Sequence, residues 1–74
     1  MDQMIYAAVR QVATSWYAIR SGQGQDHDEA LSKAMAQAQF YLYDLKLDHE
    51  SSKPYLEAAY AAIHQMLGMD STQN

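Results

Sequence analysis

Apolar side chains recur at steps of three and four residues in three separate parts of the chain. Because an α-helix has about 3.6 residues per turn, this spacing lines up apolar side chains along one side of a helix. The pattern predicts helices over about residues 2–21, 27–47 and 53–67. The positions expected to face inward are Ile5, Val9, Val12, Trp16 and Ile19 in the first helix, Leu31, Met35, Ala38, Leu42 and Leu45 in the second, and Leu56, Ala59, Tyr60, Ile63, Met66 and Leu67 in the third.

Glycines and short polar residues mark the expected ends of these helices. Glycine favours the left-handed conformation that ends a helix, and Ser or Asp caps the free backbone N–H groups at a helix start. Proline is tolerated in a first turn, and an acidic residue three positions after the cap completes a capping box. The expected markers are, in chain order, Gly22, Asp26 with Glu29, Ser51 or Ser52 with Pro54, and Gly68.

Three helices joined by short polar loops predict an all-α fold, a small antiparallel three-helix bundle with Trp16 as the largest core side chain. Residues 1–68 are expected to form one domain, and residues 69–74 a flexible tail. A chain of this size buries only about 60% of the surface that it exposes when unfolded. Without cysteine it has no disulfide to add stability, so a homodimer is expected. A long helical hairpin and a dimer that shares helices between chains are the alternatives.

Four large side chains, Phe-Tyr-Leu-Tyr, follow one another at residues 40–43. Successive helical residues point about 100° apart, so the four cannot all face one core. If Leu42 faces inward, Phe40 points almost directly away, and its neighbours at helical spacing complete a ridge. This first candidate partner-binding surface consists of Ala36, Phe40, Tyr43 and Leu47, and aromatic anchors of this kind are typical of interfaces. The alternative is that Phe40 is covered by the tail or by another helix.

A second candidate partner-binding surface follows one flank of the first helix, where Tyr6, Arg10 and Tyr17 recur at helical spacing. Tyr and Arg are enriched in protein interfaces, and the same residue types stack on nucleic-acid bases. The alternative is that these tyrosines border the core and keep their hydroxyl groups in water.

The charge of the chain narrows the choice of partner. Five Lys and Arg against nine Asp and Glu give a net charge of −4, which disfavours binding to nucleic acid and favours a larger protein that is basic or neutral. No apolar run approaches the 18 or so residues of a membrane span, and the N-terminus lacks the features of a signal peptide. We therefore expect no contact with a membrane and a cytoplasmic location.

Histidine and carboxylate residues are the candidates for metal or acid–base chemistry. His27 and His49 each lie among acidic residues, but about 20 helical residues, or about 30 Å, separate them, so one chain cannot join them in one site. Helix capping explains both clusters. His64 lies beside the apolar stripe of the third helix, and the sequence has no phosphate-binding loop and no metal-ligand motif. We therefore predict no catalytic residue, no metal site and no cofactor.

These features predict a small acidic interaction module, an inhibitor or adaptor of a larger protein, of the type found among phage and plasmid accessory proteins. The comparison with such proteins rests on size and charge alone. The alternative is a nucleic-acid-binding three-helix transcriptional regulator, although the third helix begins Ser-Lys-Pro-Tyr-Leu-Glu, which offers few side chains that read bases. An enzyme or metal-dependent module assembled between two chains is a third possibility.

Overall fold

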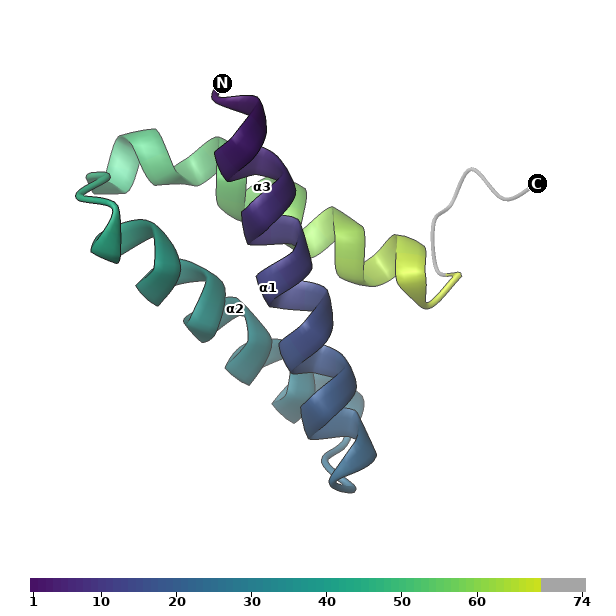
Figure 1. Cartoon of the computed structure of the whole chain (residues 1–74). Coiled ribbons are helices and arrows are strands. Elements are labelled where there is room, and N and C mark those ends of the chain that lie inside the picture. The colour runs from purple at the N-terminus through teal and green to yellow at the C-terminus, as the bar shows by residue number, and fades with distance from the viewer. Residues whose placement is uncertain (69–74) are drawn as a thin grey trace.

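The computed structural model describes residues 1–68, and these residues form three α-helices and no strand. The helices are α1 (Gln3–Gly22), α2 (His27–Asp44) and α3 (His49–Met66), as Figure 1 shows. The prediction of an all-helical domain with three compactly packed helices is confirmed. The predicted tail, residues 69–74, lies outside the described residues.

α1 is the central helix and packs against both of the others. In Figure 1, α2 leads back beside α1, and α3 crosses α1 at a wide angle. The molecule measures 32 × 30 × 18 Å along its principal axes. Packed helices lie about 8–10 Å apart, so the shortest dimension holds two layers of helices. α2 and α3 share a smaller contact than either shares with α1, so both pack mainly against α1.

Each helix begins at an aspartate whose side chain accepts hydrogen bonds from the first turn. Asp2 accepts from the N–H groups of Met4 at 2.9 Å and Ile5 at 3.2 Å. Asp26 accepts from Glu29 N–H at 2.9 Å, as the sequence predicts. These bonds satisfy donors that have no partner within the helix.

The start predicted for the third helix is wrong by four residues. Asp48 caps α3 by accepting from Ser51 N–H at 2.8 Å, so the helix begins at His49 rather than at 53. The side chain of Ser52, one of the two predicted caps, is buried instead. An aspartate is as good a cap as serine, and here it stands three residues earlier in the chain.

The first two helices end in left-handed residues, although not at the predicted ones. Gly22 is still helical, and Gly24, at φ 93°, adopts the left-handed conformation. α2 ends three residues before the predicted position 47, because Lys46 adopts φ 69°. This conformation lets the Leu47 N–H donate to the Leu42 carbonyl at 3.2 Å and closes the last turn. Gly68, at φ 71°, follows α3 as predicted.

The side of α2 that faces the core, which we call its seam, consists mostly of small residues rather than of the predicted large ones. Ala30, Ala34 and Ala38 are completely buried, whereas Leu31 and Met35 are half-buried. The helix is therefore rotated by about one residue, or 100°, from the predicted orientation over its first half. Alanine at the contact lets helix backbones approach closely, since no long side chain stands between them.

The core side chains of α1 and α3 also differ from the prediction. Tyr17 is buried and takes the place expected for Trp16, which is only half-buried at the edge of the core. Five residues expected to face inward are exposed instead, namely Ile19, Leu45, Tyr60, Met66 and Leu67. The buried side chains are Val9, Ala13 and Tyr17 in α1, Ala30, Ala34, Ala38 and Leu42 in α2, and Ser52, Tyr55, Ala59, Ala62 and Ile63 in α3.

A hydrogen bond ties the N-terminus to α3. The backbone N–H of Asp2 donates to the Tyr55 hydroxyl oxygen at 2.8 Å, and the ring of Tyr55 is buried in the core. The contact spans 53 residues of sequence, so it fixes the start of α1 on the helix that crosses it.

Candidate functional site

The outer side of α2 carries two exposed aromatic rings. Phe40 is 58% exposed and Tyr43 is 46% exposed, while Ala36 and Leu47 are half-buried beside them. We call these four residues the Phe40 face. Ala38 and Leu42, one or two positions away, are completely buried, so the seam and the Phe40 face use different sides of the same helix. None of the described residues buries the Phe40 ring.

Two local interactions hold the Phe40 face in place. Gln39 Nε2 donates to the Tyr43 hydroxyl oxygen at 2.7 Å, one turn along the helix, and restricts the ring of Tyr43. Leu47 follows the left-handed Lys46 and packs against the core through part of its side chain. The helical spacing that predicted Leu47 beside Tyr43 is lost, because α2 ends at Asp44 and Lys46 is left-handed. Phe40 and Tyr43 are therefore the members with most free area.

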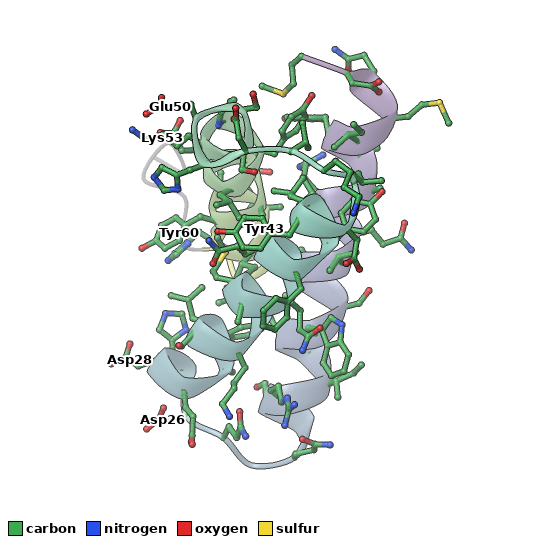
Figure 2. All side chains as sticks on the ribbon, turned by 90° about the vertical axis from the view of Figure 1, so that its left-hand side faces the viewer. Asp26, Asp28, Tyr43, Glu50, Lys53 and Tyr60 are labelled. Atoms are coloured by element: carbon green, nitrogen blue, oxygen red, sulfur yellow. The ribbon has the colours of Figure 1, made fainter. Side chains whose placement is uncertain are left out.

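Charged side chains lie beyond both ends of the Phe40 face. In Figure 2, Tyr43 lies between Glu50 and Lys53 at one end of the molecule and Asp26 and Asp28 at the other. Asp48, at the same end as Glu50, accepts a hydrogen bond from the Ser51 backbone and a second from its hydroxyl, and these bonds lower the pKa of Asp48 from 3.8. Side chains of both signs thus surround the ring, because the exposed Lys33 and Lys46 also lie on α2 or directly after it.

The second predicted surface is divided by the fold. Tyr6 and Arg10 are half-buried and lie together, with the Arg10 guanidinium carbon 5.3 Å from the centre of the Tyr6 ring. Arg10 Nη2 also donates to Gln65 Oε1 of α3 at 3.3 Å. Tyr17 is 6% exposed and belongs to the core, so it does not share this surface.

An open groove of about 650 Å³ runs between α1 and α3 beside Arg10. Its walls include the polar side chains of Gln11, Thr14 and Gln65 and the apolar side chain of Met66. The Thr14 hydroxyl donates to the Arg10 carbonyl at 3.0 Å and is thereby satisfied within α1. No polar side chain of the groove is left buried without a partner among the described residues, and the groove is too open to exclude water.

Two histidines that are far apart in sequence meet where the start of α2 approaches the end of α3. The rings of His27 and His64, which we call the histidine pair, have centres 5.9 Å apart and planes at 77°. Tyr17 Oη lies 3.0 Å from His27 Nδ1, and the Tyr60 ring lies 4.3 Å from the ring of His64. The His64 Nδ1–H donates to the Tyr60 carbonyl at 3.0 Å.

The histidine pair was not predicted from the sequence, because only the separation of His27 from His49 was considered. A signal was present in the spacing of the chain. His27 lies about as many residues before the loop between α2 and α3 as His64 lies after it. Because consecutive helices are usually neighbours, residues at equal distances from their connecting loop often lie close together. The described residues contain no group of three or more potential metal ligands.

None of the described helices is long and apolar enough to cross a membrane. Comparison with protein families, curated proteins and solved structures finds no match to this chain.

Proposed function

We propose that the chain is a small protein-interaction module that acts as an inhibitor or adaptor of a larger protein and binds it through the Phe40 face. The observation that carries this proposal is the exposure of Phe40 and Tyr43 on one side of α2, opposite the buried alanines. Aromatic side chains that fill pockets of a partner contribute most of the binding energy of many interfaces.

The exposed area is sufficient for two binding anchors. A large aromatic side chain has about 150–250 Å² of surface, so rings that are about half exposed leave roughly 100 Å² each for a partner to cover. At about 25 cal/mol per Å², burial of each ring contributes about 2–3 kcal/mol, which is the range of interface hot spots. Gln39 restricts Tyr43 before binding and so reduces the entropy lost on association.

The charge of the chain supports a partner with an apolar pocket and a basic or neutral rim. The net charge is −4, and Asp44 follows Tyr43 directly on the exposed side of α2. Two copies of this acidic chain repel each other at low salt, whereas the basic rim of a partner protein is attracted to it. We therefore favour a different protein over a second copy as the occupant of the Phe40 face. The predicted homodimer is thus the less favoured occupant of the Phe40 face, and the mass in solution tests it. The antiparallel order of the helices also stays a prediction.

The test is affinity purification from the native cells with wild-type protein, Phe40→Asp and Tyr43→Ala, followed by binding measurements with the purified partner. Ile19→Asp is the matched control, since Ile19 is 47% exposed on α1. We expect Phe40→Asp to weaken binding by at least about 30-fold, the equivalent of a 2 kcal/mol hot spot. Ile19→Asp should bind like wild type. Undiminished binding by both variants of the Phe40 face would contradict the proposal.

Light scattering over a dilution series distinguishes a partner from a second copy. If the Phe40 face joins two copies, wild type is dimeric at high concentration and Phe40→Asp is monomeric. If a different protein occupies it, Phe40→Asp leaves the mass unchanged at every concentration.

The nucleic-acid alternative has a separate test. Binding to phosphate backbones weakens steeply as salt rises, because each neutralised phosphate releases counterions. An electrophoretic shift with duplex DNA and single-stranded RNA at low salt that disappears at high salt would support the regulator and count against the protein-interaction module.

A further inference from the structure

We propose that the histidine pair, His27 and His64, binds one divalent late transition-metal ion, with Zn²⁺ as the probe. Neutral imidazole is the commonest protein ligand for such ions, and this pair brings one imidazole from the first turn of α2 to another on α3. The proposal is independent of the Phe40 face, since neither histidine belongs to it.

The separation of the two rings fits a shared ion. A Zn–N bond is about 2.0–2.1 Å long, which puts a coordinated ring centre roughly 3 Å from the metal and two rings on a tetrahedral ion roughly 5 Å apart. The observed centres are 5.9 Å apart. Binding therefore requires the two half-buried rings to approach by about 1 Å and to turn both Nε2 atoms toward the ion.

Hydrogen bonds already select the ligand form of His64. Its Nδ1–H donates to the Tyr60 carbonyl at 3.0 Å, because a carbonyl oxygen can only accept. In the neutral ring the lone pair is then on Nε2, which is free to coordinate. A histidine ligand whose other nitrogen is held by a backbone carbonyl is the usual arrangement around protein-bound metals.

The same arrangement is available to His27. Its Nδ1 lies 3.0 Å from the Tyr17 oxygen, and a phenol oxygen can accept as well as donate. When the Nδ1–H donates to Tyr17, the lone pair of His27 is also on Nε2. Tyr17 is fixed in the core, so it restricts the orientation of the ring.

Two protein ligands make an open site, in which water fills the other positions. No third histidine, cysteine or carboxylate joins the pair among the described residues, so a closed structural zinc site is excluded there. The net charge of −4 attracts a cation to the protein as a whole. We therefore expect reversible binding of one ion per chain.

The test uses protein without a histidine tag and isothermal titration with ZnCl₂ in a buffer that does not chelate metals. Wild type should bind one ion per chain, and His27→Ala and His64→Ala should each weaken binding by at least about 10-fold, since even the loss of an outer-shell partner has this effect. His49→Ala is the matched control. His49 lies fifteen residues before His64 on α3, about 22 Å along the helix, and should be dispensable.

NMR of the imidazole nitrogens in wild-type protein gives a second readout that does not depend on the folding of a variant. Zn²⁺ should shift the Nε2 signals of His27 and His64 and leave those of His49 unchanged. The proposal is overturned if the wild type binds no more Zn²⁺ than a His27→Ala/His64→Ala double variant, if His49→Ala loses as much affinity as His64→Ala, or if Zn²⁺ shifts the signals of all three histidines equally.

Discussion

Replacing Ala34 with leucine would place three extra carbon atoms in the most tightly packed part of α2. Ala34 is completely buried, between Ala30 and Ala38, which are also completely buried. The added side chain has no space and must push α2 away from α1 or adopt a strained rotamer. Insertion of extra methylene groups into a packed core destabilises by about 1–3 kcal/mol, and three such groups at one site place the effect near 3 kcal/mol.

This loss is large relative to the stability of so small a domain. A 74-residue protein has an unfolding free energy of about 4–11 kcal/mol, from about 0.05–0.15 kcal/mol per residue. A loss of 3 kcal/mol lowers the melting temperature by about 12–24 °C in a domain of this size. Urea unfolding followed by circular dichroism at 222 nm measures the change in free energy directly, and the slope of the transition shows whether the variant still unfolds in a single step.

Two further variants make the result specific to the orientation of α2. Met35→Ala removes a half-buried side chain of the predicted stripe and should lower the unfolding free energy by only about 1 kcal/mol, below the range for fully buried methionines. Ala18→Leu adds the same atoms as Ala34→Leu at an exposed position of α1 and should change stability by no more than about 0.5 kcal/mol. If Met35→Ala lowers the unfolding free energy more than Ala34→Leu does, the large residues of α2 face the core. That result would refute the packing of α2 through its small residues.

Three other substitutions test local features of the fold. Lys46→Gly removes a side chain from a residue at φ 69° and should raise the unfolding free energy by about 0.5–1 kcal/mol in chemical denaturation, whereas Lys46→Ala, which retains a Cβ atom, should give no gain. Ser52→Ala removes a buried hydroxyl that has no hydrogen-bond partner among the described residues and should stabilise by about 1 kcal/mol; a loss of stability would mean that the hydroxyl is satisfied. Asp48→Ala should lower the melting temperature most at neutral pH. The Ser51 hydrogen bonds hold the pKa of Asp48 below 3.8, so its stabilising effect is fully present above that pH and is lost as the pH falls through the lower value of the folded state. A difference in melting temperature that stays constant from pH 7 to pH 2 would contradict this assignment.

Local rules were sufficient to predict the helices but not their orientation. The capping aspartate at Asp26 and the left-handed Gly68 act within a few residues, so the sequence reveals them directly. Which side of a helix faces the core depends on how closely the helices approach, and this is a property of the whole packing. The predicted inward-facing stripe included Leu31 and Met35 because their side chains are large and apolar. The close contact between α2 and α1 buries the small side chains of Ala30 and Ala34 instead.

The prediction that Phe40 points away from the core holds despite this rotation, because it depends only on the burial of two residues near it in the sequence. Ala38 and Leu42 belong to both the predicted stripe and the observed seam, and Phe40 lies between them in sequence on the far side of the helix. The exposure of Phe40 was therefore predictable from the sequence. The burial of Tyr17 was not, because it depends on the angle at which α3 crosses α1. The spacing of His27 and His64 about the loop after α2 indicates that they are near each other, but the contact between their rings depends on the packing of the whole domain.

The most direct test of the central claim is photo-crosslinking from position 40 itself. A benzophenone amino acid replaces Phe40 in one variant and the exposed Ile19 in another, and both are irradiated in the native cells. We predict a discrete crosslinked product from position 40 that contains a different protein and that purified wild-type chain prevents, with no such product from position 19. No crosslink from position 40, or equal crosslinking from both positions, would contradict the claim that the outer side of α2 is the binding surface.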